Sequence, residues 1–451
     1  MSDLLDIAKG ILERAGGSEQ IEVFVSRSRE NEVRAYQGEI EDLTTAASDG
    51  IGIRVLVDSA SGARVGSAWA GSLDEEAVAE ALREARDNTR FATEDEYVAF
   101  ATPDGVVAPH LELSSDDIDH VSLDEKIAMA IELEKSVRSS DSRIRQVDSA
   151  GYSDYAAAGA IASTTGIAAT YGRTMAYLSV EAIATDGHED QSGWGMSAGR
   201  GPRDIDPERA RRDAVQRCTR MLGAIKPSSR KGVAVFDQRA TATLLSIIGG
   251  ALSGEAVVRG RSFFAGRIGE MVASPLFTLV DDPTDPRHFA ASPFDGEGLA
   301  CRRNSLIDAG LLRGFVYDTV SGRRAGVAST GSAQRGGIGG SPSAGVRALQ
   351  LQPGSKSQEE IFREIGDGFF IESLIGVHSG VNPISGDFSV GATGLLIRDG
   401  QLAEPIREVT VASSLQKMLQ DVIAIGSDVE WLPGTAAGQT VAIQDIALSG
   451  S

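Results

Sequence analysis

The sequence contains little cysteine, few aromatic side chains and no long hydrophobic run. Aromatic residues make up 5% of its 451 positions, and the 2 cysteines, Cys218 and Cys301, lie too far apart to suggest a disulfide framework or a Cys-x-x-Cys site. No apolar segment reaches the roughly 18–20 residues of a membrane-spanning helix, and the first residues lack the layout of a signal peptide. We therefore expect a protein of the reducing cytoplasm with no membrane association.

Basic side chains are also scarce relative to acidic ones. The chain has 43 Lys and Arg against 64 Asp and Glu, a formal net charge of −21. This charge repels phosphate backbones, and no local basic stripe offsets it, so we expect no nucleic-acid binding. A hydrophobic content of 41% suffices for a buried core, and 52 glycines indicate many tight turns. The composition argues against a helical bundle.

The segment IKPSSRKG (225–232) is the best candidate domain boundary, since it combines Pro, Ser and charge with no apolar residue after Ile225. We expect an N-terminal domain over 1–225, in which amphipathic helices alternate with strands, and a strand-rich C-terminal domain over 226–451. The second domain begins with a strand and a helix predicted over 240–258.

Two local patterns add detail to this organisation. The letters SLDE occur at 72–75 and again at 122–125, and both copies predict a capping box that opens a helix. The Gly/Ser-rich segment 329–345 has no apolar periodicity. It predicts either a mobile, ligand-covering loop or a solvated linker.

Catalytic motifs are absent or weak. The 5 histidines form no His-x-x-x-His pair, and His188, although followed by a carboxylate, lacks a second histidine four residues on. Ser414 and Lys417 match a Ser-x-x-Lys pattern without its companion signatures. Cys301 precedes two arginines, which could lower a thiol pKa, although a structural cysteine is the simpler interpretation. Motifs alone identify no catalytic apparatus.

Three segments, in this order along the chain, resemble the TldD/TldE (PmbA) family. They read GIGIRVLV (50–57), SGEAVVRGRSFFAGRIGEMVASPLFTLVDDP (253–283) and VNPISGDFSVGATGLLIRDG (381–400). The resemblance spans essentially the whole chain. It implies an α+β fold, with an N-terminal mixed α/β domain followed by a β-rich C-terminal domain of the TldD/PmbA kind.

The resemblance also identifies positions where a metal site has been lost. The TldD branch has a His-Glu-x-x-x-His zinc motif upstream of the Ser-x-Phe-Ala-Gly-Arg segment, and its three functional positions correspond here to Leu245, Ser246 and Gly250. A further cysteine ligand of that branch corresponds to Ala436. Leucine, glycine and alanine side chains cannot bind zinc. The chain therefore resembles the metal-free TldE/PmbA branch, with no catalytic residue and no metal of its own.

In this family a TldE-like chain pairs with a TldD-like zinc peptidase. The resemblance implies a non-catalytic subunit that helps to form the substrate chamber of a complex acting on unfolded peptides, precursor peptides or amide-linked metabolites. Zinc is expected in the TldD-like partner. Two alternatives stay open: a stand-alone peptide-binding protein, and a hydrolase that uses Ser414 and Lys417 or Cys301. The residues predicted to face substrate are Arg259, Arg261, Phe263, Asn382 and Asp387; the alternative for them is solvated surface or turn formation.

Overall fold

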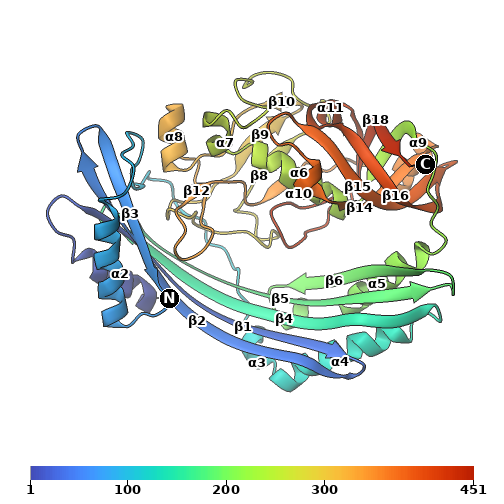
Figure 1. Ribbon diagram of the computed structural model, residues 1–451, viewed down its shortest axis with the longest axis horizontal. Helices are drawn as coiled ribbons and strands as arrows, with labels where there is room; N and C mark the ends of the chain where they lie inside the picture. The colour runs from blue at the N-terminus through green and yellow to red at the C-terminus, as the bar shows by residue number, and fades with distance from the viewer. Residues whose placement is uncertain (1, 451) are drawn as a thin grey trace.

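One long antiparallel sheet forms the first half of the protein. The computed structural model describes residues 2–450, and Figure 1 shows this sheet curving beneath the second half of the chain. Its strand order is β3-β2-β1-β4-β5-β6. The strands are β1 (Gln20–Tyr36), β2 (Glu39–Ser59), β3 (Gly62–Ala70), β4 (Ile144–Ser163), β5 (Ala168–Thr185) and β6 (Asp190–Gly199).

Helices cover one face of this sheet, as the alternation of β1 requires. Ile21, Val23 and Val25 are buried against the helices α1 and α2, whereas Phe24 points to the opposite, concave face. The helices α4 and α5 cover β4, β5 and β6 in the same way. The helical elements are α1 (Ser2–Leu12), α2 (Glu75–Asn88), α3 (Asp117–His120), α4 (Leu123–Arg138), the 3₁₀ turn η1 (Pro202–Asp204) and α5 (Pro207–Arg220).

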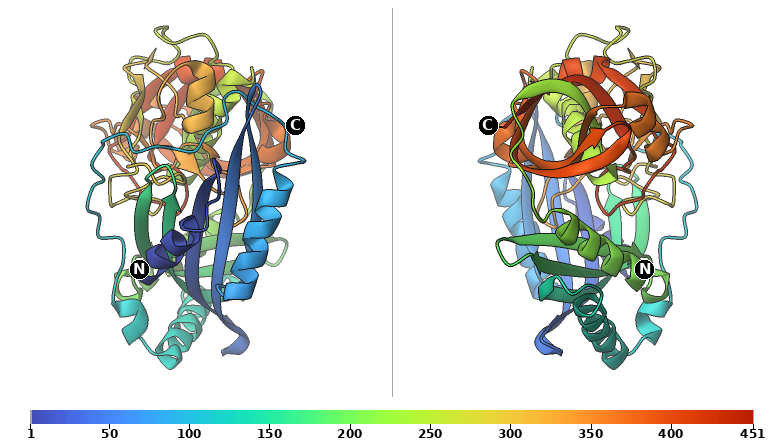
Figure 2. Two further views of the ribbon diagram at one scale, coloured as in Figure 1. Left: turned by 90° about the vertical axis from the view of Figure 1, so that its left-hand side faces the viewer. Right: turned by 90° about the vertical axis from the view of Figure 1, so that its right-hand side faces the viewer.

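The second half is built around a closed ring of strands. Its main sheet has the order β16-β15-β14-β7-β18-β17, and β16 also pairs with β18, which closes the ring. Helix α6 (Gln238–Ala251) lies in the hydrophobic core that these strands enclose, as the right-hand view of Figure 2 shows. The strands are β7 (Arg230–Phe236), β14 (Gly368–Ile375), β15 (Asp387–Arg398), β16 (Gln401–Ser414), β17 (Val422–Ile425) and β18 (Val441–Ser449).

Shorter elements complete the second half. A small sheet has the order β10-β9-β8-β13, and β11 pairs with β12. These strands are β8 (Leu279–Asp281), β9 (Asn304–Asp308), β10 (Leu311–Leu312), β11 (Ala333–Gln334), β12 (Ser343–Ala344) and β13 (Leu349–Leu351). The remaining helices are α7 (Gly254–Val258), α8 (Thr319–Ala325), α9 (Gln358–Ile365), α10 (Val377–Gly380) and α11 (Leu415–Gln420).

The α+β class is confirmed by this arrangement. The chain leaves the first sheet after α5 and enters the ring at β7; the domain limits 1–225 and 226–451 themselves stay a prediction.

The Gly/Ser-rich segment packs closely against β2. This close approach requires glycine at position 52, since a Cβ there would lie 2.0 Å from the carbonyl oxygen of Ile338. None of the helices within residues 2–450 is long and apolar enough to cross a membrane.

Two local predictions differ from the structure. The Ser122 copy of SLDE forms a capping box with Glu125, but at 72–75 Ser72 bonds Asp74 instead, and Glu75 pairs with Arg14. The single helix predicted over 240–258 is broken after α6. There the backbone N–H of Gly254 donates to the carbonyl of Val316 at 2.7 Å, a contact outside the helix.

Candidate functional site

Helix α6 carries Leu245, Ser246 and Gly250 and contacts the segment that holds Ala436. Asp237 caps its N-terminus, where the carboxylate accepts from the backbone N–H of Ala240 at 2.7 Å. Two turns on, the hydroxyl of Ser246 lies 2.9 Å from that of Thr435, which is 189 positions away in the sequence and adjacent to Ala436. Folding therefore joins the two segments that the resemblance selected independently.

The side chains at this junction, which we call the α6–Thr435 junction (Leu245, Ser246, Gly250, Thr435 and Ala436), do not fit a zinc ion. Leu245, Gly250 and Ala436 offer no donor atom, and the hydroxyl of Ser246 already donates to the carbonyl of Ala242 at 2.9 Å. Nowhere in residues 2–450 do three His, Cys, Asp or Glu side chains converge as a metal site needs. The side chains of the junction therefore cannot hold a catalytic zinc ion.

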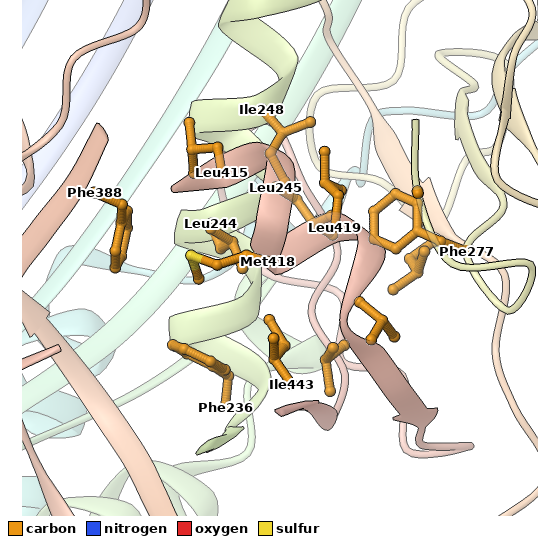
Figure 3. Packing of buried hydrophobic residues seen from close by; sticks show 14 of the residues in the cluster. Phe236, Leu244, Leu245, Ile248, Phe277, Phe388, Leu415, Met418, Leu419 and Ile443 are labelled. Atoms are coloured by element: carbon orange, nitrogen blue, oxygen red, sulfur yellow. The ribbon is translucent and has the colours of Figure 1, made fainter. Parts of the chain in front are cut away.

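Apolar packing fills the space beside the junction. Leu245 is buried in the core next to Ile248 and Leu419 (Figure 3). The residual void along this side of α6 measures about 10 Å³, close to the minimum that one water molecule occupies. Gly250, by contrast, is exposed on the last turn of the helix, and a Cβ there would meet nothing within 4 Å.

The predicted substrate-facing residues after α6 lie at the surface or in the core. Arg259 and Arg261 are exposed, and Arg259 forms an ion pair with Glu255 one helical turn earlier at 2.6 Å. Phe263 is partly buried, with its ring centroid 4.2 Å from that of Phe264. Their role in substrate contact stays a prediction.

Asn382 and Asp387 shape a turn before β15. The side-chain oxygen of Asn382 accepts from the backbone N–H groups of Ile384 and Ser385 at 2.9 and 3.2 Å. Asp387 accepts from the hydroxyl of Ser385 at 2.6 Å. These contacts are those of an Asx turn, the alternative raised from the sequence, and both residues remain exposed beside it.

Neither alternative nucleophile is activated. Ser414 caps α11, where its hydroxyl accepts from the backbone N–H of Lys417. Hydrogen bonds to Asp421 and Asp445 raise the pKa of Lys417, which opposes a role as general base. Cys301 is buried, and burial raises the pKa of its thiol to about 12, so the reactive thiolate is disfavoured.

The histidines do not converge. His188 lies exposed in the turn between β5 and β6, and His378 is exposed on α10. His288 is buried against Trp431, with ring centroids 4.7 Å apart, and its Nε2 has no hydrogen-bond partner. Burial lowers its pKa to about 4, so the ring is neutral near pH 7.

A second polar region, not predicted from the sequence, lies where the first sheet meets the second half. Glu22 of β1 is buried between Arg54 of β2, at 2.9 Å, and Arg335 of the Gly/Ser-rich segment. Burial by itself would raise the pKa of Glu22, but the two guanidinium groups hold it below its usual range. In the sequence, this region is indicated by the carboxylate of Glu22 between the apolar residues Ile21 and Val23.

Comparison with known proteins agrees with the resemblance over the whole chain. Models of PmbA/TldA metallopeptidase domain 1, central domain and C-terminal domain match residues 21–89, 116–222 and 229–450. Metalloprotease PmbA of Escherichia coli O157:H7 is 28% identical over 97% of this chain and 93% of its own length. The Haemophilus influenzae homologue is 25% identical over the same shares. The crystal structure of TldE from Thermococcus kodakarensis shares the fold, with a TM-score of 0.87 and 24% identity over the full length of both chains.

Proposed function

The chain belongs to the PmbA/TldD metallopeptidase family, and we propose that it is a non-catalytic, TldE-like subunit of a heteromeric zinc metallopeptidase. The observation that carries this proposal is the α6–Thr435 junction. Two distant segments that would supply zinc ligands in the catalytic branch meet here, yet Leu245, Gly250 and Ala436 cannot ligate a metal.

In this proposal the zinc and the hydrolytic water belong to a TldD-like partner. This chain contributes walls and strand edges to the substrate chamber, where an extended chain can be held through main-chain hydrogen bonds. The substrates are unfolded peptides, precursor peptides or amide-linked metabolites, and the complex works in the cytoplasm. The candidate substrate contacts of the C-terminal half remain Arg259, Arg261, Phe263, Asn382 and Asp387.

Metal content and activity of the chain alone and of the co-expressed pair test the proposal. After zinc loading and desalting, the chain alone should retain background zinc and should hydrolyse no peptide from a mixed unfolded-peptide library. The pair, formed with the TldD-like chain of the same genome, should elute as one complex, carry zinc and hydrolyse peptides. The partner with its own zinc-motif Glu replaced by Gln is the matched inactive control.

Three outcomes would contradict the proposal. Near-stoichiometric zinc in the chain alone would show a metal site elsewhere in the protein. Hydrolysis by the chain alone that disappears in Ser414→Ala or Cys301→Ala would support the alternative of a hydrolase without a metal. Peptide binding by the chain alone, with no complex formed, would favour a stand-alone peptide-binding protein.

A further inference from the structure

A cavity of about 300 Å³ lies between the concave face of the first sheet and the loops of the second half. Phe24 of β1, Ile161 of β4 and Tyr171 of β5 form its sheet side. Arg335 and Ile338 of the Gly/Ser-rich segment, with Arg347, close it from the other side. The cavity thus depends on both halves of the chain.

The cavity opens along the sheet face. A second hollow of about 580 Å³ shares Arg27, Gly172 and Arg173 with it and continues over β1, β2, β4 and β5. This continuation is largely lined by small side chains, among them Ala156 and Ala157. A short ligand can therefore reach the cavity along the sheet without displacing either half of the protein.

Two arginines in the cavity have no carboxylate partner. Arg173 and Arg347 form no ion pair with any residue in the range 2–450. Arg347 makes a long hydrogen bond of 3.4 Å to the carbonyl of Ala333, and the buried Nε of Arg173 has no acceptor at all. Arg335 differs from them, because its guanidinium pairs with Glu22.

The charge of Arg347 acts on the buried carboxylates of Asp295 and Asp281, although neither forms an ion pair with its guanidinium. Asp295 lines the cavity, but its carboxylate already accepts from the backbone N–H groups of Glu297, Leu299 and Ala333 at 2.8–3.0 Å. Burial raises the pKa of Tyr171, while the charges of Arg173, Arg347 and Arg335 act in the opposite direction. Its phenol thus stays a neutral donor among guanidinium groups.

Partly buried guanidinium groups that form no direct ion pair favour an anion, and a carboxylate matches the geometry of their fork. The apolar wall of Phe24 and Ile161 lies beside them, so the complementary ligand is a carboxylate attached to an apolar group. We propose that this cavity binds the free carboxyl end of a short peptide between Arg173 and Arg347. The chain as a whole has a net charge of −21, whereas the arginines make this cavity locally positive.

Calorimetric titration of the full chain with two matched ligands tests the proposal. Acetyl-Ala-Leu with a free carboxylate and acetyl-Ala-Leu amide have nearly the same shape and differ by one charge. The acid should bind at least about tenfold more tightly than the amide. Arg173→Gln and Arg347→Gln should each weaken binding of the acid by at least about tenfold. Arg83→Gln, the same change on the exposed face of α2, should leave it unchanged.

The proposal stands apart from the role of the chain in a metallopeptidase, because binding is measured without a partner or zinc. Equal binding of acid and amide, no binding at about 10 mM, or an equal effect of Arg83→Gln would overturn it. Inorganic phosphate that binds as tightly as the acid would also overturn it, since the apolar wall would then contribute nothing. If the Gln variants do not fold, Arg173→Lys and Arg347→Lys retain the charge but lose the fork, and should still weaken binding.

Discussion

The α6–Thr435 junction is packed with apolar side chains, whereas the cavity between the first sheet and the second half is lined by guanidinium groups. At the junction Leu245 and Ala436 are buried in the apolar core, and the space beside Leu245 is filled. Beside the cavity, the buried Glu22 pairs with Arg54 and with Arg335, and Arg335 also lines the cavity. We therefore expect the free energy of unfolding to depend on side-chain size at the junction and on side-chain charge beside the cavity.

The largest expected effect is loss of the Glu22 carboxylate, which pairs with Arg54 and Arg335 beside the cavity. Glu22→Gln keeps the size of the side chain but leaves Arg54 and Arg335 buried without a counter-charge, so the free energy of unfolding should fall by about 3–5 kcal/mol. Urea denaturation near pH 7, followed by far-UV circular dichroism, measures the change.

The control makes the same substitution at the surface. Glu75 also pairs with an arginine, Arg14 at 2.9 Å, but its side chain is 79% exposed. Glu75→Gln should therefore change stability by less than about 1 kcal/mol. If both variants lose a similar amount of unfolding free energy, burial of the Glu22 ion pairs has no energetic consequence. The region beside the cavity would then not depend on charge as proposed.

Truncation of Leu245 tests the packed region. Leu245→Ala removes buried methyl groups beside Ile248 and Leu419 and should lower the free energy of unfolding by about 2–5 kcal/mol. Leu402→Ala, at a position 40% exposed, should lower it by less than about 1 kcal/mol. A small effect of Leu245→Ala would mean that neighbouring side chains move into the space left by Leu245. The packing of this region would then not depend on the size of that side chain.

The charged region should also make stability depend on pH through Glu297. Burial, together with the nearby charges of Asp295, Asp318 and Glu22, raises the pKa of Glu297 above its ordinary value of 4.5. The folded state then holds a proton that the unfolded state releases, so stability should fall as pH rises above about 4.5, by up to about 1.4 kcal/mol per pH unit.

Urea denaturation at several pH values between about 5 and 8 measures this dependence, and Glu297→Gln should flatten it. Glu359→Gln, an exposed change on α9, should leave the slope as it is in the unsubstituted chain. A slope that survives in Glu297→Gln would assign the titration to another group. Leu245→Ala should shift the whole curve without changing its slope, because no charge lies at that position.

The sequence predicted the two regions unequally for a physical reason. Resemblance located Leu245, Ser246 and Ala436, and the structure adds the hydroxyl contact between Ser246 and Thr435 that shows the segments meet. Arg173 and Arg347 gave no signal, because each follows ordinary strand or loop residues and only the packing of the two halves brings them to one cavity. Tertiary contacts of this kind are not encoded in local patterns.

The repeated letters SLDE show the same limit at the scale of one helix turn. Ser122 and Glu125 form the predicted capping box. In the copy at 72–75, the carboxylate of Glu75 forms an ion pair with Arg14 instead. The resemblance implied the α+β class, and local patterns predicted strands in both halves of the chain. The closure of the ring through β16 and β18 was not predicted, since it joins strands distant in sequence.

The smallest expected effect is a difference in stability between alanine substitutions at two neighbouring glycines of α6. A Cβ on Gly250 would meet nothing within 4 Å, so Gly250→Ala should stabilise the protein by about 0.5–1 kcal/mol through its helix propensity. A Cβ on Gly249 would lie 2.6 Å from methyl groups of Leu349 and Val346, so Gly249→Ala should destabilise it by about 1 kcal/mol. Thermal denaturation of both variants measures the difference. Stabilisation by both variants would show that the core next to α6 yields easily. Opposite signs would confirm that close packing ends at Gly249, one residue before the exposed Gly250.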